Sequence, residues 1–177
     1  KAKDVEVDLV ITPAGEYTIK YELGVTSEEL CTLATECWDN SDTAADIASG
    51  SQLRDGMVIL PCTMDVVAKM AHGISDTLLL RSFDVMLKEN RRILIVPRET
   101  PLNENHLDNL LRLKRMGVIV LPPMATFYHL PESIMDLVDF IVARILDQFE
   151  IPHRLGERWK KPKMRGTHLL VLLCTRK

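Results

Sequence analysis

Two long apolar runs, each ended by a polar turn, are the clearest pattern along the chain. They cover residues 55–64 and 91–101, and the segment between them, 65–90, has helical character. Continuous apolar runs of this kind are typical of strands buried inside a parallel sheet. Because ligands bind at the carboxyl ends of such strands, we expect Thr63 and Arg98 to face the same crevice.

Strand-like and helix-like segments alternate along the rest of the chain. β-branched runs that stop at prolines indicate strands, and a polar cap followed by acidic residues, as at Ser27, indicates the start of a helix. The predicted segments are a strand at 5–12, a helix at 13–23, a short helix at 27–37, a loop with one helical turn at 40–54, a strand at 117–121 and a long helix at about 131–149. This order predicts an α/β fold with a parallel sheet.

The long C-terminal helix carries one apolar stripe. Its members recur at helical spacing and are Ile134, Leu137, Val138, Ile141, Val142, Ile145, Leu146 and Phe149. A stripe of this kind normally faces the core, so we interpret it as packing rather than as a cofactor site. Arg144 lies about 110° from the centre of the stripe at 100° per residue, so it flanks the buried face and reaches either water or a bound anion.

Length and composition fit a single globular domain. The chain has 177 residues, 46% of them apolar, and a net charge of −3. No apolar run approaches the roughly 18 residues of a membrane span, so we expect a cytoplasmic protein that does not bind membranes. We divide the chain into an α/β domain at 1–153 and a basic tail at 154–177, which holds eight Lys or Arg and one acid.

The tail offers no aromatic platform for bases, so we interpret its charge as a solvated face and expect no nucleic-acid partner. Its apolar run at 168–174 fits an additional strand, a contact with a neighbouring subunit or a segment foreign to the fold, and the sequence does not choose among them.

The cysteines and histidines show no metal or redox spacing. The four cysteines are Cys31, Cys37, Cys62 and Cys174. They are too few for a disulfide scaffold and lack the C-x-x-C spacing, so we expect reduced structural thiols. The five histidines form no H-E-x-x-H motif and no catalytic order with serine, so we expect no metal.

Two features at strand ends suggest chemistry. Arg98 and Glu99 follow a wholly apolar strand, where a charged pair must be ion-paired, solvated or bound to a ligand. Arginine suits phosphate, and a glutamate beside it can hold or move a proton. The turn from Thr63 to Val66 opens a helix whose backbone N–H groups can bind an anion, although it is not a Walker loop. Lys88 and Trp159, taken singly, look like ordinary surface and packing residues.

Eight short motifs, spread from about Val5 to Trp159, occur together in one order. They are SGS at 49–51, DGMVILPCTM at 55–64, LKE at 87–89, PRETPL at 97–102, HLDNLL at 106–111, PPM at 122–124, FYHLP at 127–131 and ARILDQF at 143–149. This series closely resembles the UbiX-like flavin prenyltransferases. The members that belong to phenolic acid, or hydroxyarylic acid, decarboxylase systems look nearest.

The resemblance implies a fold, a cofactor and a reaction. The fold is a flavodoxin-like, Rossmann-type three-layer sandwich, and the protein is an FMN-binding homododecamer with its sites between subunits. The enzymes of the family join the dimethylallyl group of dimethylallyl phosphate to N5 and C6 of reduced FMN. The prenylated FMN passes to a UbiD-type decarboxylase, which is why members are often named as parts of aromatic acid decarboxylases. The resemblance implies no metal.

Carried over residue by residue, the resemblance implies two sets of site residues. The FMN-binding set is Thr12, Thr63, Met64, Asp65, Val66 and Arg98. The substrate-binding set is Glu22, Lys88, Arg98, Glu99, Tyr128, Arg144 and Trp159. Within it, Glu99, Lys88 and Arg144 are the implied catalytic residues, with Lys88 reaching over from a neighbouring subunit. Preorganised cations would stabilise the departing phosphate, and Glu99 would handle a proton near flavin N5.

The chain departs from the family pattern at two places. The family's first strand ends in a Gly-Ala-Ser-Gly or Gly-Ala-Thr-Gly turn, and this sequence begins at Lys1, beyond that turn. We therefore expect the first strand and the Gly-rich loop to be missing from the sheet. Val66 replaces a usual threonine and loses one polar contact, whereas Thr12 and Thr63 keep the hydroxyl of the family's serines.

Two other functions share this fold. FMN-dependent cysteine decarboxylases resemble residues 61–73, but they carry a P-x-M-N-x-x-M-W motif where this chain has PRETPLN at 97–103. A non-catalytic FMN-binding or scaffold protein of an aromatic acid decarboxylase system is the other alternative. Val66 and the missing loop favour it, whereas a scaffold has no need of the basic residues of a phosphate site.

Overall fold

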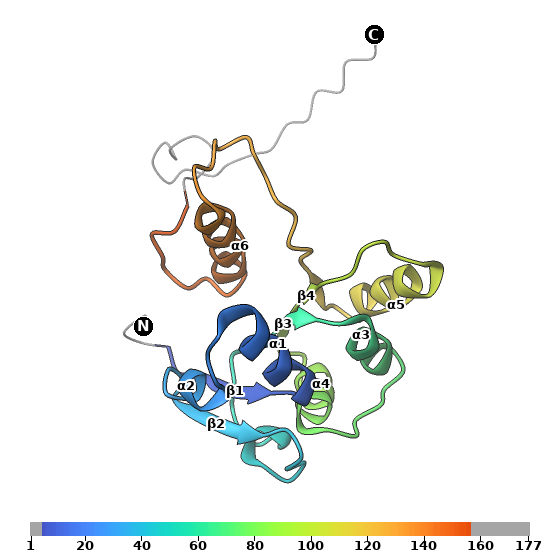
Figure 1. The fold of residues 1–177 in the computed structure, drawn as a ribbon. Helices are drawn as coiled ribbons and strands as arrows, with labels where there is room; N and C mark the ends of the chain where they lie inside the picture. Colours follow the sequence, from blue (N-terminus) through green and yellow to red (C-terminus); the bar gives the residue numbers. More distant parts are fainter. Residues whose placement is uncertain (1–4, 157–177) are drawn as a thin grey trace, which may run out of the picture.

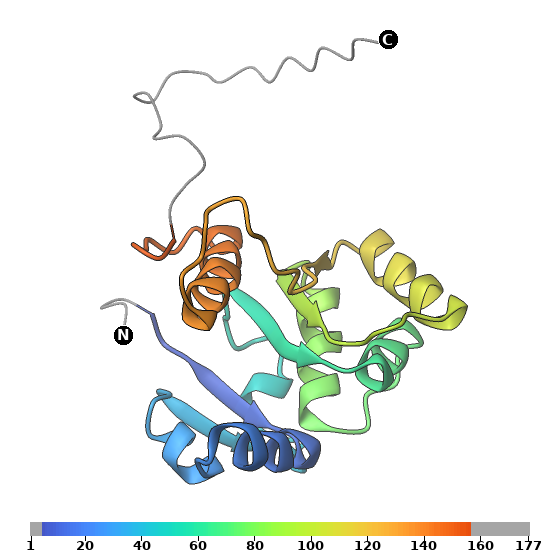
Figure 2. The same cartoon turned by 45° about the horizontal axis from the view of Figure 1, so that its top comes forward.

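A computed structural model describes residues 5–156, and its strands form two parallel sheets (Figures 1 and 2). One sheet pairs β1 (Asp8–Ile11) with β2 (Glu36–Asp39), and the other has the order β3 (Gly56–Cys62), β4 (Arg92–Pro97) and β5 (Ile119–Val120). All of these pairs are parallel, so the predicted α/β class is confirmed.

Helices connect the strands. They are α1 (Pro13–Leu23), α2 (Ser27–Cys31), the short 3₁₀ helix η1 (Asp46–Ala48), α3 (Met64–Ala71), α4 (Leu78–Lys88), α5 (Glu104–Arg115) and α6 (Ile134–Gln148). The predicted helix at 13–23 has the bounds of α1, and the predicted helical turn in the loop overlaps η1. Within residues 5–156, no helix is long and apolar enough to cross a membrane.

Strand β4 is the centre of a three-layer arrangement. Its side chains alternate between the two faces of the sheet, as the pleat requires. Ile93 and Ile95 pack in a core with side chains of α3, α4 and α5, whereas Leu94 and Val96 pack against Ile145 of α6. The helices α3, α4 and α5 therefore lie on one face of the sheet and α6 lies on the other (Figure 2). The register of Cys62 with Pro97 brings the carboxyl ends of β3 and β4 to one edge.

The smaller sheet is attached through the end of β2 and through an ion pair of Asp8 in β1 with Arg54. The backbone N–H of Leu78 donates to the Asn40 carbonyl at 2.9 Å, and the N–H of Leu79 donates to the Asn40 side chain at 3.1 Å. Leu78 is fully buried in a small cluster that also contains Val10 and Trp38. Within the described residues no ladder joins β1 to β3, so the sheet is divided at this position.

Several predicted segments differ from the observed elements. The helical segment 65–90 is two helices, because the chain turns through 72–77 with Gly73 at a φ of +70°. The short helix ends at Cys31, and its N-cap is Thr26, whose hydroxyl accepts from the Glu29 N–H at 3.2 Å. Residues 36–39 form β2, and α5 was not predicted.

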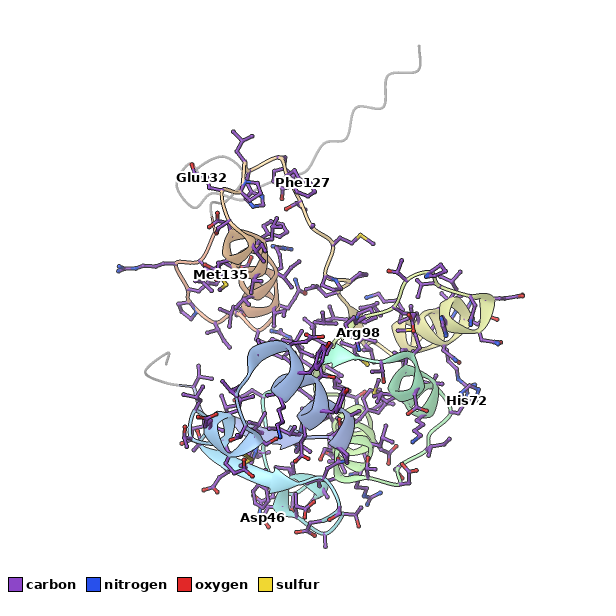
Figure 3. The ribbon with its side chains drawn as sticks, viewed as in Figure 1. Asp46, His72, Arg98, Phe127, Glu132 and Met135 are labelled. Carbon is purple, nitrogen blue, oxygen red and sulfur yellow. A yellow bond between two sulfur atoms is a disulfide. The ribbon has the colours of Figure 1, made fainter. Side chains whose placement is uncertain are left out.

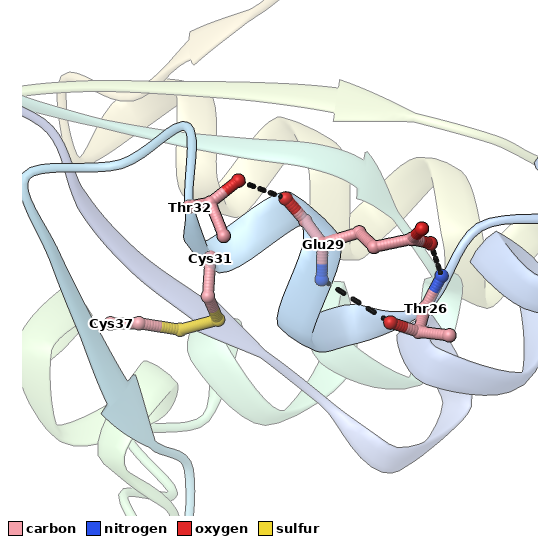
Figure 4. Close-up of a disulfide and its surroundings, with 5 residues drawn as sticks. All are labelled: Thr26, Glu29, Cys31, Thr32 and Cys37. Atoms are coloured by element: carbon pink, nitrogen blue, oxygen red, sulfur yellow. Dashed lines mark hydrogen bonds between the residues drawn. A yellow bond between two sulfur atoms is a disulfide. The ribbon is translucent and has the colours of Figure 1, made fainter.

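The expectation of reduced thiols is wrong for two cysteines. Cys31, the last residue of α2, is joined to Cys37 in β2 by a disulfide, with 5.5 Å between their Cα atoms (Figure 4). The reason is local geometry, because the chain reverses between α2 and β2 and brings the two thiols together. Cys62 is free and buried, and Cys174 lies outside the described residues.

The stripe of the long helix is core only in its second half. Ile145 is 7% exposed and packs on the sheet, whereas Ile134 is 79% and Val138 44% exposed. Ile141, Ile145 and Phe149 belong to the apolar cluster with Leu94 and Val96, whereas Ile134 and Val138 are not part of this cluster in a single chain. The interpretation of the whole stripe as packing is therefore wrong for its first turns.

We expect the disulfide to stabilise the fold by closing a short loop in the unfolded chain. Replacing both Cys31 and Cys37 with serine should lower the free energy of unfolding by about 2 kcal/mol. Urea denaturation measures this loss. Dithiothreitol should lower the free energy of unfolding of the wild type by a similar amount and leave that of the double variant unchanged. If the reductant does not change the free energy of unfolding of the wild type, the prediction is wrong.

A second prediction concerns the contact between β3 and the end of α6. Gly56 lies against the Phe149 ring, where a Cβ atom would collide with the ring and approach the Arg92 carbonyl oxygen at 3.1 Å. Gly56→Ala should therefore lower the free energy of unfolding by about 1 to 3 kcal/mol. The loss should shrink in a Phe149→Leu background, as measured by urea denaturation. Equal losses in both backgrounds would show that the collision with the Phe149 ring does not cause the loss of stability.

Candidate functional site

The carboxyl ends of β3 and β4 meet at one edge of the sheet. Cys62 pairs with Pro97 in the register of these strands, and the backbone N–H of Arg98 donates to the Cys62 carbonyl at 3.0 Å. Thr63 directly follows Cys62, so Thr63 and Arg98 lie at the same edge of the sheet; that they face one crevice stays a prediction. The ligand-binding edge of a parallel sheet therefore holds a cation next to a helix start.

Thr63 is the N-cap of α3. Its hydroxyl accepts from the Val66 N–H at 3.4 Å, with a backbone φ of −75° and ψ of 157°. The first N–H groups of a helix have no partner within the helix and favour anions or polar ring edges. Val66 thus contributes its backbone to the turn even though it lacks the hydroxyl of a threonine.

The thiol of Cys62 lies directly beneath this turn. Burial raises the pKa of Cys62 to about 12, so the thiol stays protonated and is a poor nucleophile at neutral pH. Its role is packing in the core that includes Met64.

Arg98 and Glu99 extend from the same edge into solvent. Both side chains are exposed, and the Glu99 carboxylate accepts from the Thr100 N–H at 3.0 Å. Figure 3 shows Arg98 at the end of β4, away from Phe127 and Glu132 near α6. An arginine and a carboxylate at this position can bind an anion and hold a proton next to it.

Thr12 repeats this arrangement at the end of β1. Its hydroxyl accepts from the Gly15 N–H at 3.0 Å and caps α1. An open cavity of about 620 Å³ adjoins it, and its lining includes the carboxylates of Glu16, Glu28 and Asp39. Negative charge of this kind disfavours phosphate, so the cavity does not suit the phosphate end of a ligand.

Tyr128 and Arg144 are both related to Phe140 of α6. The Tyr128 ring meets the Phe140 ring edge-on with 6.1 Å between centroids, and Phe140 is one helical turn before Arg144. Arg144 is half exposed and donates from Nη1 to Asp147 at 2.9 Å. Arg144 therefore offers a cation on α6, and Tyr128 packs its ring on the same helix.

Lys88 lies at the opposite end of β4 from Arg98. It ends α4, just before the strand, and forms an ion pair with Glu89; this hydrogen bond and the lysine charge lower the pKa of Glu89. Six residues of strand separate the two positions by roughly 20 Å. A single chain therefore does not bring Lys88 to Arg98.

The remaining predicted residues add little to the geometry of one chain. Glu22 is exposed near the end of α1, and Trp159 lies outside the described residues. The structure thus brings the Thr63–Val66 turn together with Arg98 and Glu99, whereas Tyr128 packs against Phe140 of the helix that carries Arg144. Within residues 5–156, no group of three or more His, Cys, Asp or Glu could hold a metal ion.

Two residues next to Arg144 were missed at the level of sequence. Asp147 bonds Arg144 and also contacts His153 at 3.1 Å. The spacing of three between Arg144 and Asp147 is a recognisable signal for a helical ion pair. His153 gives no such signal, because it follows the end of α6 and reaches Asp147 only after the chain turns back.

Comparison with known proteins places the chain in a family. A family model described as Flavoprotein matches residues 1–146. The chain is 48% identical over 159 residues to a "Probable UbiX-like flavin prenyltransferase" of Bacillus subtilis (strain 168), covering 90% of this chain and 78% of that protein. It is 45% identical over 169 residues to flavin prenyltransferase UbiX of Halalkalibacterium halodurans, covering 90% and 82%.

Solved structures show the same likeness. The chain matches a dodecameric FMN-dependent UbiX-like decarboxylase from Escherichia coli O157:H7 with a TM-score of 0.88 at 42% identity, covering 90% of this chain and 86% of that one. It matches AnUbiX (PadA1), solved with FMN and dimethylallyl pyrophosphate, with a TM-score of 0.87 at 42% identity, covering 90% and 85%. The cysteine decarboxylase TvaF, at 17% identity and a TM-score of 0.56, shares the fold alone. With the carboxyl-edge geometry of β3 and β4, these matches show that the chain belongs to the UbiX-like flavin prenyltransferase family.

Proposed function

We propose that this protein transfers the dimethylallyl group of dimethylallyl phosphate to N5 and C6 of reduced FMN. The observation that carries the proposal is the bond from the Arg98 N–H to the Cys62 carbonyl, which fixes Arg98 and Glu99 beside the capped start of α3. A solved relative that contains both FMN and dimethylallyl pyrophosphate supports the same chemistry.

The residues at the sheet edge fit FMN. The capped starts of α1 and α3 present backbone N–H groups, and Thr12, Thr63 and Arg98 add polar atoms at the carboxyl ends of β1, β3 and β4. Reduced FMN, when bound, supplies the nucleophilic atoms of the reaction. Met64 and Asp65 belong to the turn that would contact it, and Met64 is buried beneath that turn.

Basic residues and a hydroxyl are proposed to bind the substrate phosphate. Breaking the allylic carbon–oxygen bond leaves negative charge on the phosphate, and cations fixed in advance stabilise that charge most in the transition state. We assign this role to Lys88, Arg98, Tyr128 and Arg144. We assign to Glu99, which is exposed beside Arg98, the role of accepting the proton that the flavin ring loses.

The separation of these residues within one chain supports a site shared between subunits. Lys88 lies at the wrong end of β4 to meet Arg98 of its own chain, so we assign it to the site of a neighbour. Exposed apolar side chains such as Ile134 and Leu130 suit burial between subunits, and one relative is a dodecamer. We propose a homododecamer, with Glu22 and Trp159 completing each pocket.

The product is proposed to serve a UbiD-type decarboxylase, and the enzyme is proposed to work in the cytoplasm. Prenylated FMN is a modified cofactor with no further use at this site, so a second enzyme must accept it.

The assignment of residues 1–153 to the flavin-binding domain and of 154–177 to a basic tail remains a prediction.

The mass of the released flavin tests the proposed function. After anaerobic incubation with reduced FMN and dimethylallyl phosphate, we expect a flavin heavier by one prenyl unit, detected by mass spectrometry. Dimethylallyl pyrophosphate should be run in parallel to define the phosphate that is used. Bound but unmodified FMN with both donors would favour the scaffold alternative, and no bound flavin would show that the motifs of this chain do not suffice for binding.

The role of Arg98 gives a separate prediction. Arg98→Ala should lower kcat/KM for prenylation by about 100-fold, because the substrate phosphate loses a cation that stabilises its charge in the transition state. Arg112→Ala is the matched control, since Arg112 is exposed on α5, away from this edge. Steady-state kinetics on both variants measures the effect. Comparable losses in the two variants would exclude a specific role for Arg98.

A further inference from the structure

Arg144 is held by a carboxylate that a buried histidine also contacts. Asp147 binds the Arg144 Nη1 with one oxygen at 2.9 Å and the His153 Nε2 with the other at 3.1 Å. The exposed fractions fall along this series, from 50% for the Arg144 side chain to 22% for Asp147 and 7% for His153. A half-exposed cation is thus linked through Asp147 to a buried residue.

The hydrogen bonds of His153 fix its tautomer. Its Nδ1 lies 3.2 Å from the Leu155 backbone N–H, which can only donate, so Nδ1 accepts. The ring hydrogen is therefore on Nε2 and is donated to the Asp147 carboxylate. A neutral imidazole in this state orients the carboxylate without adding a second positive charge that would compete with Arg144.

The chain after α6 is folded back to place this histidine. The Ile151 N–H donates to the Leu146 carbonyl at 3.1 Å, and Glu150 has a φ of +58°, which reverses the chain at the helix end. At Gly156 a Cβ atom would lie 3.9 Å from the Ala143 Cβ, so the returning segment runs along α6. The backbone of this returning segment therefore positions His153 next to Asp147.

We propose that Asp147 and His153 are positioning residues for Arg144 in substrate binding. His153 orients the Asp147 carboxylate, and Asp147 holds the guanidinium so that its remaining N–H donors face the phosphate of the allylic substrate. This inference rests on the proposed function, because it takes the Arg144 ligand to be dimethylallyl phosphate. Asp147 and His153 themselves do not touch the substrate.

The benefit of such an arrangement is preorganisation. A free arginine side chain has many rotamers, and ordering it when the substrate binds opposes binding. A guanidinium has five N–H donors, and an ion pair through Nη1 leaves donors for a second oxyanion. The ion pair of Nη1 with Asp147 therefore orients the remaining N–H donors of the Arg144 guanidinium before the substrate binds.

The test compares variants of Asp147 and His153 in the FMN-loaded protein. Calorimetry gives the Kd for dimethylallyl phosphate, and prenylation kinetics gives kcat and KM. Asp147→Asn should raise the Kd and KM about tenfold, as expected when a binding group loses its orientation. His153→Phe, which removes the Nε2 donor, should have a similar effect, and His153→Gln, whose amide can donate from nearly the same position, should recover most of the affinity.

A double variant separates positioning from a general loss of structure. If Asp147 acts only through Arg144, then Arg144→Ala combined with Asp147→Asn should bind the substrate no more weakly than Arg144→Ala alone. Asp84→Asn is the matched control, because it breaks another i,i+3 arginine pair, Arg81 with Asp84, on α4. Thermal unfolding of each variant reports its stability separately.

The outcomes distinguish this inference from the proposed function. Additive losses in the double variant, or wild-type affinity in Asp147→Asn, would overturn the positioning role even if prenylated FMN forms. Conversely, tight substrate binding without turnover would contradict the proposed reaction, while the variant Kd values would still decide the role of Asp147. Wild-type affinity in Arg144→Ala would overturn the inference, because no cation would then need positioning.

Discussion

The parallel pairing of β3 with β4 is the interaction on which the candidate site depends. β4 is buried from Ile93 to Pro97 and packs helices on both faces, so its position is set by the whole core. The register of Cys62 with Pro97 then fixes where both strands end. A slip of one residue would reverse the faces of β4 and move Arg98 away from the start of α3.

The site divides into two parts with different physical origins. The Thr63 turn, Arg98 and Glu99 are placed by strand ends, where the Cys62–Pro97 pair and the hydrogen bond from the Arg98 N–H to the Cys62 carbonyl join β3 to β4 just after an irregularity in register between Ile59 and Cys62. Arg144 is placed by a helix and by a carboxylate that a buried histidine contacts. These parts, together with Lys88, lie at different places on one chain, which explains why an enzyme of this family would need neighbouring subunits to complete a phosphate site.

The smaller sheet is less firmly integrated than the larger one. It joins the rest of the fold through Asn40, the Leu78 cluster and the ion pair of Asp8 in β1 with Arg54, and the disulfide between Cys31 and Cys37 ties α2 to β2 within it. Helix α1, which begins at Pro13 after its cap Thr12, has no buried side chain in a single chain. The part of the site on β1 therefore depends more on local caps and cross-links than on core packing.

Of the two long apolar runs predicted to be buried strands, β4 is buried, whereas β3 leaves Val58 and Leu60 exposed in a single chain. The sequence by itself determined the fold class, the burial of β4, the bounds of α1 and the position of Thr63 and Arg98 at one edge. These features are local or periodic, since apolar runs, prolines and caps act over a few residues. Short β2, the break between α3 and α4, and the exposed first turns of α6 could not be predicted, because they depend on which surfaces the neighbouring elements cover. Only the tertiary structure joined Cys31 to Cys37, placed Lys88 away from Arg98 and brought His153 back to Asp147, because these relations arise where the chain reverses or where distant segments pack.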